Sequence, residues 1–294
     1  MLPIFRGAAT ALLTPFRPDG SIDLPAWDRL LERQLDAGIA ALVVCGTTGE
    51  AATLSEAERA SIIEFTAVYT RSRMKVIAGI GGNDTLAAAN AARRAERLGA
   101  DALLLTTPYY NKTSSEGIVR HFAYVAEHSE LPLIVYNVPG RTGVSCTPEH
   151  YARLAEIPRI NGVKEASGDI SLVSRTRHLC GDALNIWSGN DDQTLPMLAL
   201  GAKGVISVAS NIVPQVMATL CAAALSGDFF TARAIHEAYA GLFDALFYEV
   251  NPIPVKTAMQ MLGWDSGRLR LPLCPMAEGN AAKLQNCLES LQLL

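Results

Sequence analysis

The feature that most constrains this fold is a series of short apolar segments that recur along the first three-quarters of the chain. Each segment is rich in Val, Ile, Leu and Ala and is bounded by Gly, Pro, Asn or Thr, which is typical of buried strands. The segments are residues 8–13, 41–45, 75–80, 102–106, 133–137, 162–165, 185–188 and 204–208. They follow one another at intervals of roughly 20 to 35 residues, which leaves room for a crossover helix between parallel strands.

The stretches between these segments carry helix signals. Residues 55–58, Ser-Glu-Ala-Glu, have the form of a capping box at a helix start. An apolar stripe over residues 88–98 ends at Gly99, as expected of a glycine just past a helix C-terminus. Pro148, directly after Thr147, suits the first position of another helix. The pattern therefore predicts strands that alternate with helices.

Eight strand–helix units predict an α/β protein with a (β/α)₈ TIM barrel. The alternative, a Rossmann sheet, needs G-x-G-x-x-G after its first strand, whereas Thr14-Pro15-Phe16 follows residues 8–13. Beyond residue 225 the strand signals stop, and the helical patterns over 229–246, 257–261 and 278–293 are interrupted at Asn251-Pro252-Ile253-Pro254. We therefore expect a catalytic barrel over residues 1–225 and a C-terminal helical segment over residues 226–294, packed on the barrel.

Composition excludes several classes of protein. With 49% hydrophobic and 18% charged residues the chain is too apolar for disorder, and its net charge of −4 is spread without a basic block. We expect no nucleic-acid partner and no membrane partner. No signal peptide is apparent, and Asn211 and Pro214 interrupt the longest uncharged stretch, residues 204–227.

Cysteine and histidine usage points to a cytoplasmic protein without a metal site. The 6 cysteines lie far apart without a C-x-x-C pair, which suits reduced thiols. The 5 histidines form no H-E-x-x-H or H-x-H arrangement. We expect neither a metal nor any other cofactor.

Lys164 stands out because it lies inside an apolar strand segment, residues 162–165. An ammonium group in a strand that is buried on both faces is costly unless it is paired, neutral or functional. For an arbitrary lysine we would favour a position at the strand end, with the stem extended to water. The functional alternative is that burial favours the neutral amine, which can attack a carbonyl and form a Schiff base.

Other polar residues fall at the predicted carboxyl ends of strands, where TIM barrels carry their catalytic groups. They are residues 46–50 (Gly-Thr-Thr-Gly-Glu), 106–111 (Thr-Thr-Pro-Tyr-Tyr-Asn), 136–141 (Tyr-Asn-Val-Pro-Gly-Arg), 188–191 (Ser-Gly-Asn-Asp) and Ser207. Hydroxyls can relay protons, and an arginine can clamp a carboxylate. Taken singly, these motifs are explained as turns, rim packing or solvated charge. Their occurrence at successive strand ends favours an active site that contains Lys164.

Five motifs, in this order, resemble the 4-hydroxy-tetrahydrodipicolinate synthase (dihydrodipicolinate synthase) family of class I pyruvate-dependent aldolases and lyases. They are residues 46–50, 136–143 (Tyr-Asn-Val-Pro-Gly-Arg-Thr-Gly), 163–166 (Val-Lys-Glu-Ala), 204–207 (Gly-Val-Ile-Ser) and 251–256 (Asn-Pro-Ile-Pro-Val-Lys). The resemblance covers almost the whole chain. It implies a lyase of lysine and diaminopimelate biosynthesis that condenses pyruvate with L-aspartate 4-semialdehyde through a lysine Schiff base.

The resemblance also implies roles for individual residues and an assembly. Lys164 matches the Schiff-base lysine, and Tyr136 matches the general acid/base, with Thr47 and Tyr110 as the proton relay. Thr48 matches the residue that holds the carboxylate of pyruvate, and Arg141 the residue that holds the carboxylate of the semialdehyde. Gly189 and Ile206 match backbone contacts in the site. The family's counterpart of Tyr110 reaches into a neighbouring subunit. We therefore expect a homotetramer built as a dimer of dimers.

One departure concerns feedback inhibition by lysine. Asn83 and Tyr109 match parts of the pocket with which sensitive family members bind lysine. Glu56, however, replaces a histidine of that pocket, and Ala87 replaces the glutamate that holds the ligand's ammonium group. Because an ammonium group without its carboxylate partner binds poorly in a buried site, we expect weak or absent lysine feedback.

Two other functions remain open from the sequence. The first is a sister lyase with the same lysine and tyrosine, such as N-acetylneuraminate lyase or a 2-keto-3-deoxy-acid or 4-hydroxy-2-oxoglutarate aldolase. Arg141 and residues 251–256 favour the synthase over these enzymes. The second is a barrel that binds a keto acid or an amino acid without chemistry. The presence together of Lys164, Tyr136, Tyr110 and Thr47 argues against it, since binding alone needs no nucleophile.

Overall fold

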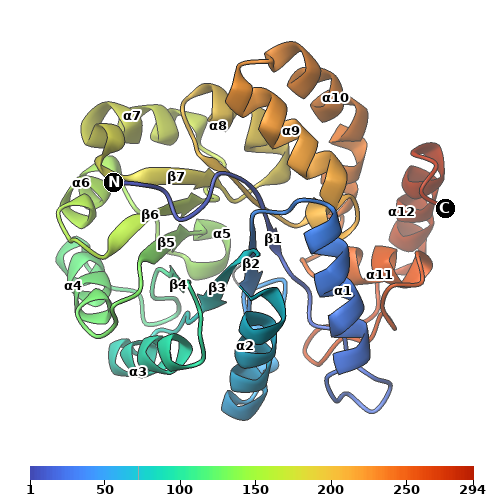
Figure 1. Cartoon of the computed structure of the whole chain (residues 1–294), viewed down its shortest axis with the longest axis horizontal. Coiled ribbons are helices and arrows are strands. Elements are labelled where there is room, and N and C mark those ends of the chain that lie inside the picture. Colours follow the sequence, from blue (N-terminus) through green and yellow to red (C-terminus); the bar gives the residue numbers. More distant parts are fainter. Residues whose placement is uncertain (72) are drawn as a thin grey trace.

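The computed structural model describes residues 1–71 and 73–294, and its centre is a closed barrel of parallel strands that follow one another in sequence order (Figure 1). The strands are β1 (Gly7–Ala11), β2 (Ala41–Val44), β3 (Lys75–Gly79), β4 (Ala102–Thr106), β5 (Leu133–Asn137), β6 (Ile160–Glu165), β7 (Asn185–Ser188) and β8 (Gly204–Ser207). Pairing of Ala8 with Val205 and of Thr10 with Ser207 closes the barrel between β1 and β8. The predicted TIM barrel is confirmed, with strand ends shifted from the prediction by a residue or two.

Helices cover the outside of the barrel. They are α1 (Leu24–Asp36), α2 (Glu56–Thr70), α3 (Thr85–Arg97), α4 (Ser115–Ala126), α6 (Pro148–Ala155), α7 (Ile170–Cys180), α8 (Thr194–Ala199) and α9 (Pro214–Ser226), while the short α5 (Pro139–Thr142) lies at the end of the barrel. The predicted capping box is present, because Ser55 accepts a hydrogen bond from the Glu58 amide while the Glu58 carboxylate accepts one from the Ser55 amide. Gly99, just past α3, has the left-handed φ of +89° that favours glycine there.

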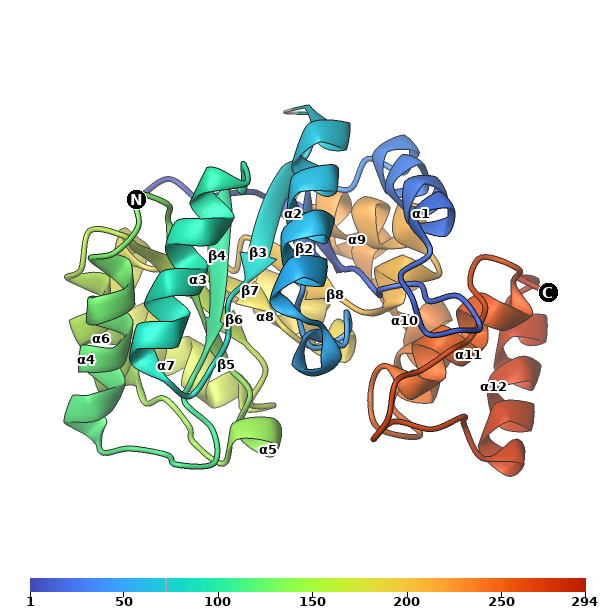
Figure 2. The same ribbon diagram turned by 90° about the horizontal axis from the view of Figure 1, so that it is seen from below.

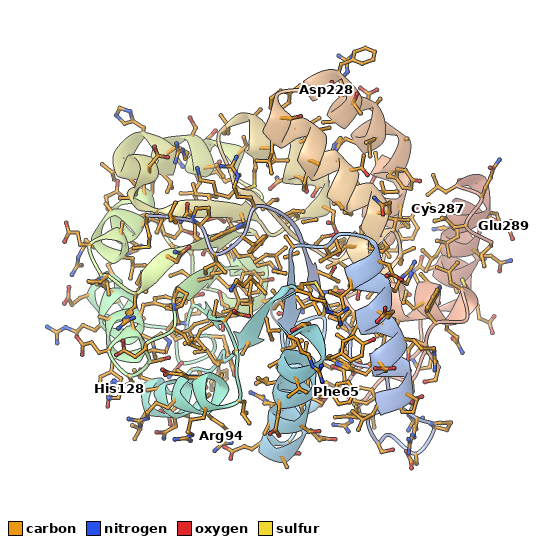
Figure 3. The ribbon with its side chains drawn as sticks, in the orientation of Figure 1. Phe65, Arg94, His128, Asp228, Cys287 and Glu289 are labelled. Carbon is orange, nitrogen blue, oxygen red and sulfur yellow. The ribbon has the colours of Figure 1, made fainter. Side chains whose placement is uncertain are left out.

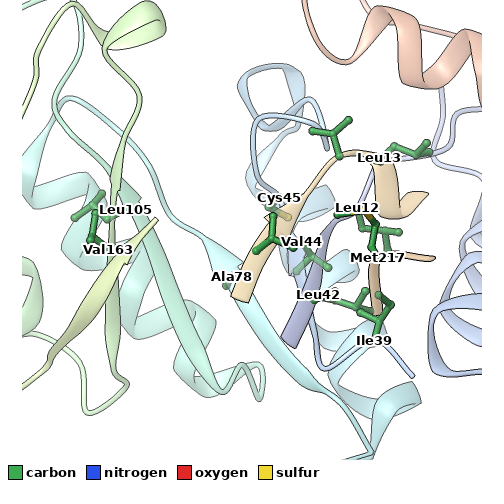
Figure 4. Close-up of a cluster of buried hydrophobic side chains, with 14 of the residues drawn as sticks. Leu12, Leu13, Ile39, Leu42, Val44, Cys45, Ala78, Leu105, Val163 and Met217 are labelled. Atoms are coloured by element: carbon green, nitrogen blue, oxygen red, sulfur yellow. The ribbon is translucent and has the colours of Figure 1, made fainter. Parts of the chain in front are cut away.

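Two apolar layers result from the alternation of side chains along the strands. Outward-facing residues such as Leu42, Val44, Leu105 and Val163 belong to the large cluster between strands and helices (Figure 4). Their neighbours in sequence, such as Val43 and Leu104, belong to a smaller cluster inside the barrel. The strands are thus buried on both faces, which explains why they read as continuous apolar runs.

Trp187 is the largest side chain of the interior cluster and is fully buried. The ring of Phe5, which precedes β1, stacks on it with 5.0 Å between ring centroids. On the neighbouring strand, a Cβ atom added to Gly162 would lie 2.6 Å from Cζ3 of Trp187. Glycine at position 162 therefore makes room for the indole, two residues before Lys164.

Three further helices follow the barrel: α10 (Phe229–Ala245), α11 (Ile253–Met261) and α12 (Glu278–Ser290). They lie at the side of the barrel near α1 and α9, away from α4 and α6 (Figures 1 and 2). The helix that follows the predicted interruption at residues 251–254 begins earlier than expected. It is α11, which begins at Ile253 and has Pro254 in its first turn, where no amide hydrogen is needed. No helix in the described ranges is both long and apolar enough to cross a bilayer.

The C-terminal segment is tied to α2 by Arg270, whose guanidinium pairs with the carboxylate of Glu58. This contact is the main reason why the pKa of Glu58 is lowered from its usual 4.5 to about 2. A carboxyl group with a lowered pKa stabilises the folded state above its unfolded pKa and loses that contribution as the pH falls toward the folded value.

We predict that Glu58→Gln, which keeps the capping box, lowers the free energy of unfolding near neutral pH. The loss should shrink as the pH falls from about 4.5 toward about 2, because the wild-type carboxylate becomes protonated there. Urea denaturation at several pH values measures this, with the exposed Glu64→Gln on the same helix as control. A loss that is independent of pH would show that the ion pair is not its source.

Candidate active site

A cavity of about 320 Å³ lies at the carboxyl ends of the strands and includes residues from several of them. Thr47 follows β2, Thr106 ends β4, Tyr136 belongs to β5, and Arg141 lies on the short helix α5. In Figure 2, α5 lies at the end of the barrel toward which the strand arrows of β3 and β4 point. Asn251, from the C-terminal segment, completes one side. The predicted groups at the ends of β2, β4 and β5 therefore come together, with Arg141 on a helical turn instead of a loop, whereas residues 188–191 and Ser207 are not among the described lining residues.

Lys164 lies deep beside this cavity. In the sheet register it stands between Tyr136 of β5 and Trp187 of β7, and it is only 5% exposed. Its Nζ atom lies 4.3 Å from the centre of the Tyr136 ring. The side chain is thus packed on an aromatic face inside the barrel and does not reach bulk water, so the simpler explanation for a lysine in a strand does not apply to it.

Gly189 and Ile206 border the same position. A Cβ atom on Gly189 would lie 3.1 Å from Cε of Lys164 and 2.6 Å from Cβ of Ala166, so only glycine leaves the lysine stem its present room. The Gly189 amide donates a hydrogen bond to the Glu165 carbonyl at 2.8 Å. Ile206 is fully buried and belongs to the interior cluster that also contains Tyr136.

Glu165, the residue after Lys164, anchors the end of β6 from the opposite face of the sheet. Its buried carboxylate accepts hydrogen bonds from the Tyr151 hydroxyl at 2.5 Å, the Asn137 amide group at 3.0 Å and the Ser167 backbone amide at 2.8 Å. Burial raises the pKa of both Glu165 and Tyr151. No role was predicted for Glu165, although a second charged residue in the same apolar strand was a visible signal.

Residues 46–50, here called the threonine loop, connect β2 to the next helical turn. Thr47 lines the cavity, whereas Thr48 is buried behind it. The Thr48 hydroxyl accepts a hydrogen bond from the side-chain amide of Asn251 at 2.9 Å, and the Asn251 carbonyl accepts one from Arg141 at 2.9 Å. Asn251 therefore joins the two residues for which carboxylate binding was predicted.

Tyr110 is a predicted site residue that the single chain leaves facing solvent. Its side chain is 91% exposed, while the preceding Tyr109 lines the cavity. The backbone of Tyr110 has a φ of +63°, in the left-handed region that is uncommon for a bulky residue. An exposed phenol on a strained backbone next to an active-site cavity suits a group that is used outside its own chain.

Cys45 is a second potential nucleophile and lines the cavity, but burial raises the pKa of its thiol to about 12, so it stays protonated at neutral pH. Within residues 1–71 and 73–294, no three His, Cys, Asp or Glu side chains gather in a way that could hold a metal ion. Nucleophilic catalysis by an amine is the chemistry that the described groups support best.

Comparisons with known proteins agree with this arrangement. Residues 4–291 match the model of the dihydrodipicolinate synthetase family. The 4-hydroxy-tetrahydrodipicolinate synthase of Thermodesulfovibrio yellowstonii is 48% identical over 99% of this chain and 100% of its own.

Two solved structures extend the match to three dimensions. The dihydrodipicolinate synthase of Thermotoga maritima superposes with a TM-score of 0.97 at 43% identity, over 99% of this chain and 100% of the other. The chloride-inhibited dihydrodipicolinate synthase of Acinetobacter baumannii, complexed with pyruvate, gives 0.97 at 40% identity over 99% and 100%. With the family model matching nearly its whole length, this chain belongs to the dihydrodipicolinate synthetase family.

Proposed function

We propose that this protein is a lyase that condenses pyruvate with L-aspartate 4-semialdehyde, in the manner of a 4-hydroxy-tetrahydrodipicolinate synthase. The observation that carries the proposal is the position of Lys164, which is 5% exposed and packed on Tyr136 beside a cavity at the strand ends. Family membership and the pyruvate complex of the Acinetobacter baumannii enzyme support it.

In the proposed reaction the neutral amine of Lys164 attacks the C2 carbonyl of pyruvate, and loss of water leaves an imine. A proton leaves the methyl group to give an enamine, whose methylene carbon attacks the aldehyde of the semialdehyde. The amine of that substrate then attacks the imine carbon, closes the ring and releases Lys164. Tyr136, whose ring packs against the amine, is the general acid/base of these proton transfers.

The remaining predicted residues bind the substrates or relay protons. Thr48 and Arg141, joined through Asn251, hold the carboxylates of pyruvate and of the semialdehyde. Backbone atoms of Gly189 and Ile206 border the imine, where Gly189 lies next to the lysine stem. Thr47 starts a proton relay toward solvent.

The relay is completed by Tyr110 from a second copy of the chain. This accounts for a tyrosine that is 91% exposed in the single chain although it adjoins the cavity residue Tyr109. On this basis we propose a dimer across Tyr110, and from the resemblance to the family we propose a homotetramer built as a dimer of such dimers. A dimer across Tyr110 is the smallest assembly that meets the requirement.

Borohydride reduction in the presence of pyruvate should attach a pyruvyl group to Lys164, because reduction traps an imine as a stable amine. Peptide mass spectrometry identifies the modified residue. Lys256 provides an internal control, since it is also buried but lies in an ion pair with Glu50 and should stay unmodified. Absence of an adduct on Lys164 would refute the mechanism.

The same preparation distinguishes the synthase from sister lyases. Turnover of pyruvate with aspartate semialdehyde should far exceed cleavage of N-acetylneuraminate or of 4-hydroxy-2-oxoglutarate, because Arg141 is held as a clamp for the carboxylate of a short substrate. The reverse order would assign the chain to a sister lyase while leaving the role of Lys164 intact.

Inhibition by lysine should be weak. The cavity between α2 and α3 that contains Glu56 and Ala87 is lined by arginines, namely Arg59, Arg93, Arg94 and Arg97. Glu56 already pairs with Arg94 of α3, which is labelled in Figure 3, at 2.7 Å. An ammonium ligand would meet cations there without a free carboxylate. Initial-rate measurements should show no inhibition by micromolar lysine, and a micromolar inhibition constant would contradict this expectation.

A further inference from the structure

A buried ion pair connects the C-terminal segment to the threonine loop. The Nζ atom of Lys256, on α11, lies 2.6 Å from Oε1 of Glu50, the last residue of that loop, and the two side chains are 0% and 1% exposed. Removing two charges from water costs several kcal/mol for each ion, and their attraction repays this only with good geometry and further hydrogen bonds. Such a pair is weak evidence for stability and calls for another explanation.

The backbone of Glu50 is itself unusual. Its φ of +53° lies in the left-handed region, where a residue other than glycine costs of order 1 kcal/mol or more. Its amide donates a hydrogen bond to the Thr47 carbonyl at 3.1 Å, and the next amide, of Ala51, donates one to the Gly46 carbonyl at 3.3 Å. These bonds close the turn that carries Thr47 and Thr48, so the conformation of Glu50 determines the shape of the loop.

Both members of the pair have a second anchor in the C-terminal segment. Lys256 donates a hydrogen bond to the Arg268 carbonyl at 2.7 Å, and its Nζ atom lies 4.1 Å from the centre of the Phe16 ring. The other carboxylate oxygen of Glu50 accepts a hydrogen bond from the Arg270 amide at 3.0 Å. The carboxylate is therefore held at two points by residues that lie far along the chain from the loop.

We propose that Glu50 and Lys256 are positioning residues, which hold the threonine loop in the conformation that keeps Thr47 at the cavity and Thr48 next to it, bonded to Asn251. The inference rests on the proposed function, in which Thr48 binds the pyruvate carboxylate and Thr47 relays protons. Asn251, five residues before Lys256, bonds to the Thr48 hydroxyl from the same segment. The C-terminal segment thus contacts the threonine loop at its middle, Thr48, and at its end, Glu50. Through these contacts the segment contributes to catalysis.

Asp265 offers a matched comparison within the same cluster. It is a second carboxylate that interacts electrostatically with Lys256 and is mostly buried. None of the contacts described above that hold the threonine loop uses the Asp265 carboxylate. Asp265→Asn therefore removes a neighbouring charge of the same sign and leaves the anchor of the threonine loop in place.

The experiment compares the steady-state kinetics of Glu50→Gln, Lys256→Met and Asp265→Asn in the full-length protein, with folding of each variant checked by circular dichroism and urea denaturation. Glu50→Gln should raise KM for pyruvate, because it removes the charge that holds the threonine loop. It should also lower kcat by about tenfold or more, since a hydrogen bond to a charged group that is lost or misaligned is worth roughly this factor. Asp265→Asn should stay within about twofold of the wild type in both constants. Should Lys256→Met fail to fold, the nearly isosteric Glu50→Gln still decides the question.

Borohydride trapping separates this proposal from the proposed function. Glu50→Gln should still form the adduct on Lys164 at saturating pyruvate, because the nucleophile is untouched. Wild-type kinetics for Glu50→Gln, or equal losses in Glu50→Gln and Asp265→Asn, would overturn the positioning role. A wild-type enzyme that forms no adduct would instead overturn the Schiff-base mechanism.

Discussion

The arrangement of the candidate active site depends on the burial of one amine, that of Lys164. Lys164 belongs to a strand that is covered on both faces, and its stem passes Gly189 to end against the ring of Tyr136. A lysine amine held beside a cavity in this way can attack a carbonyl and form a Schiff base. The small residues around it, Gly162 beside Trp187 and Gly189 beside the lysine itself, exist because larger side chains would collide there.

The surroundings of this amine are held by polar residues to which the proposed reaction assigns no chemical step. Glu165 anchors the end of β6 on the helix side of the sheet through Tyr151 and Asn137. On the other side of the cavity, Asn251 and Lys256 hold the threonine loop. The proposed nucleophile lies on a barrel strand, and the C-terminal segment, which is outside the barrel, holds the loop that lines the proposed substrate site.

Much of this arrangement could be predicted from the sequence. Strands that are buried on both faces are continuous apolar runs, so all eight were visible, and the carboxyl ends of parallel strands share one end of the barrel, so Thr47, Tyr136 and Arg141 could be placed near Lys164. The ion pair of Glu50 with Lys256 could not, because no local pattern relates residues so far apart. The start of α11 was missed because proline was taken as a break where a first helical turn accepts it.

The assignment of Lys164 can be tested most directly by a crystal structure of the protein grown or soaked with pyruvate. Our account predicts continuous electron density from the Nζ atom of Lys164 to C2 of pyruvate, with the pyruvate carboxylate at the Thr48 hydroxyl. Pyruvate bound without a covalent bond to Lys164, or bound away from the cavity that Tyr136 and Thr47 line, would contradict it.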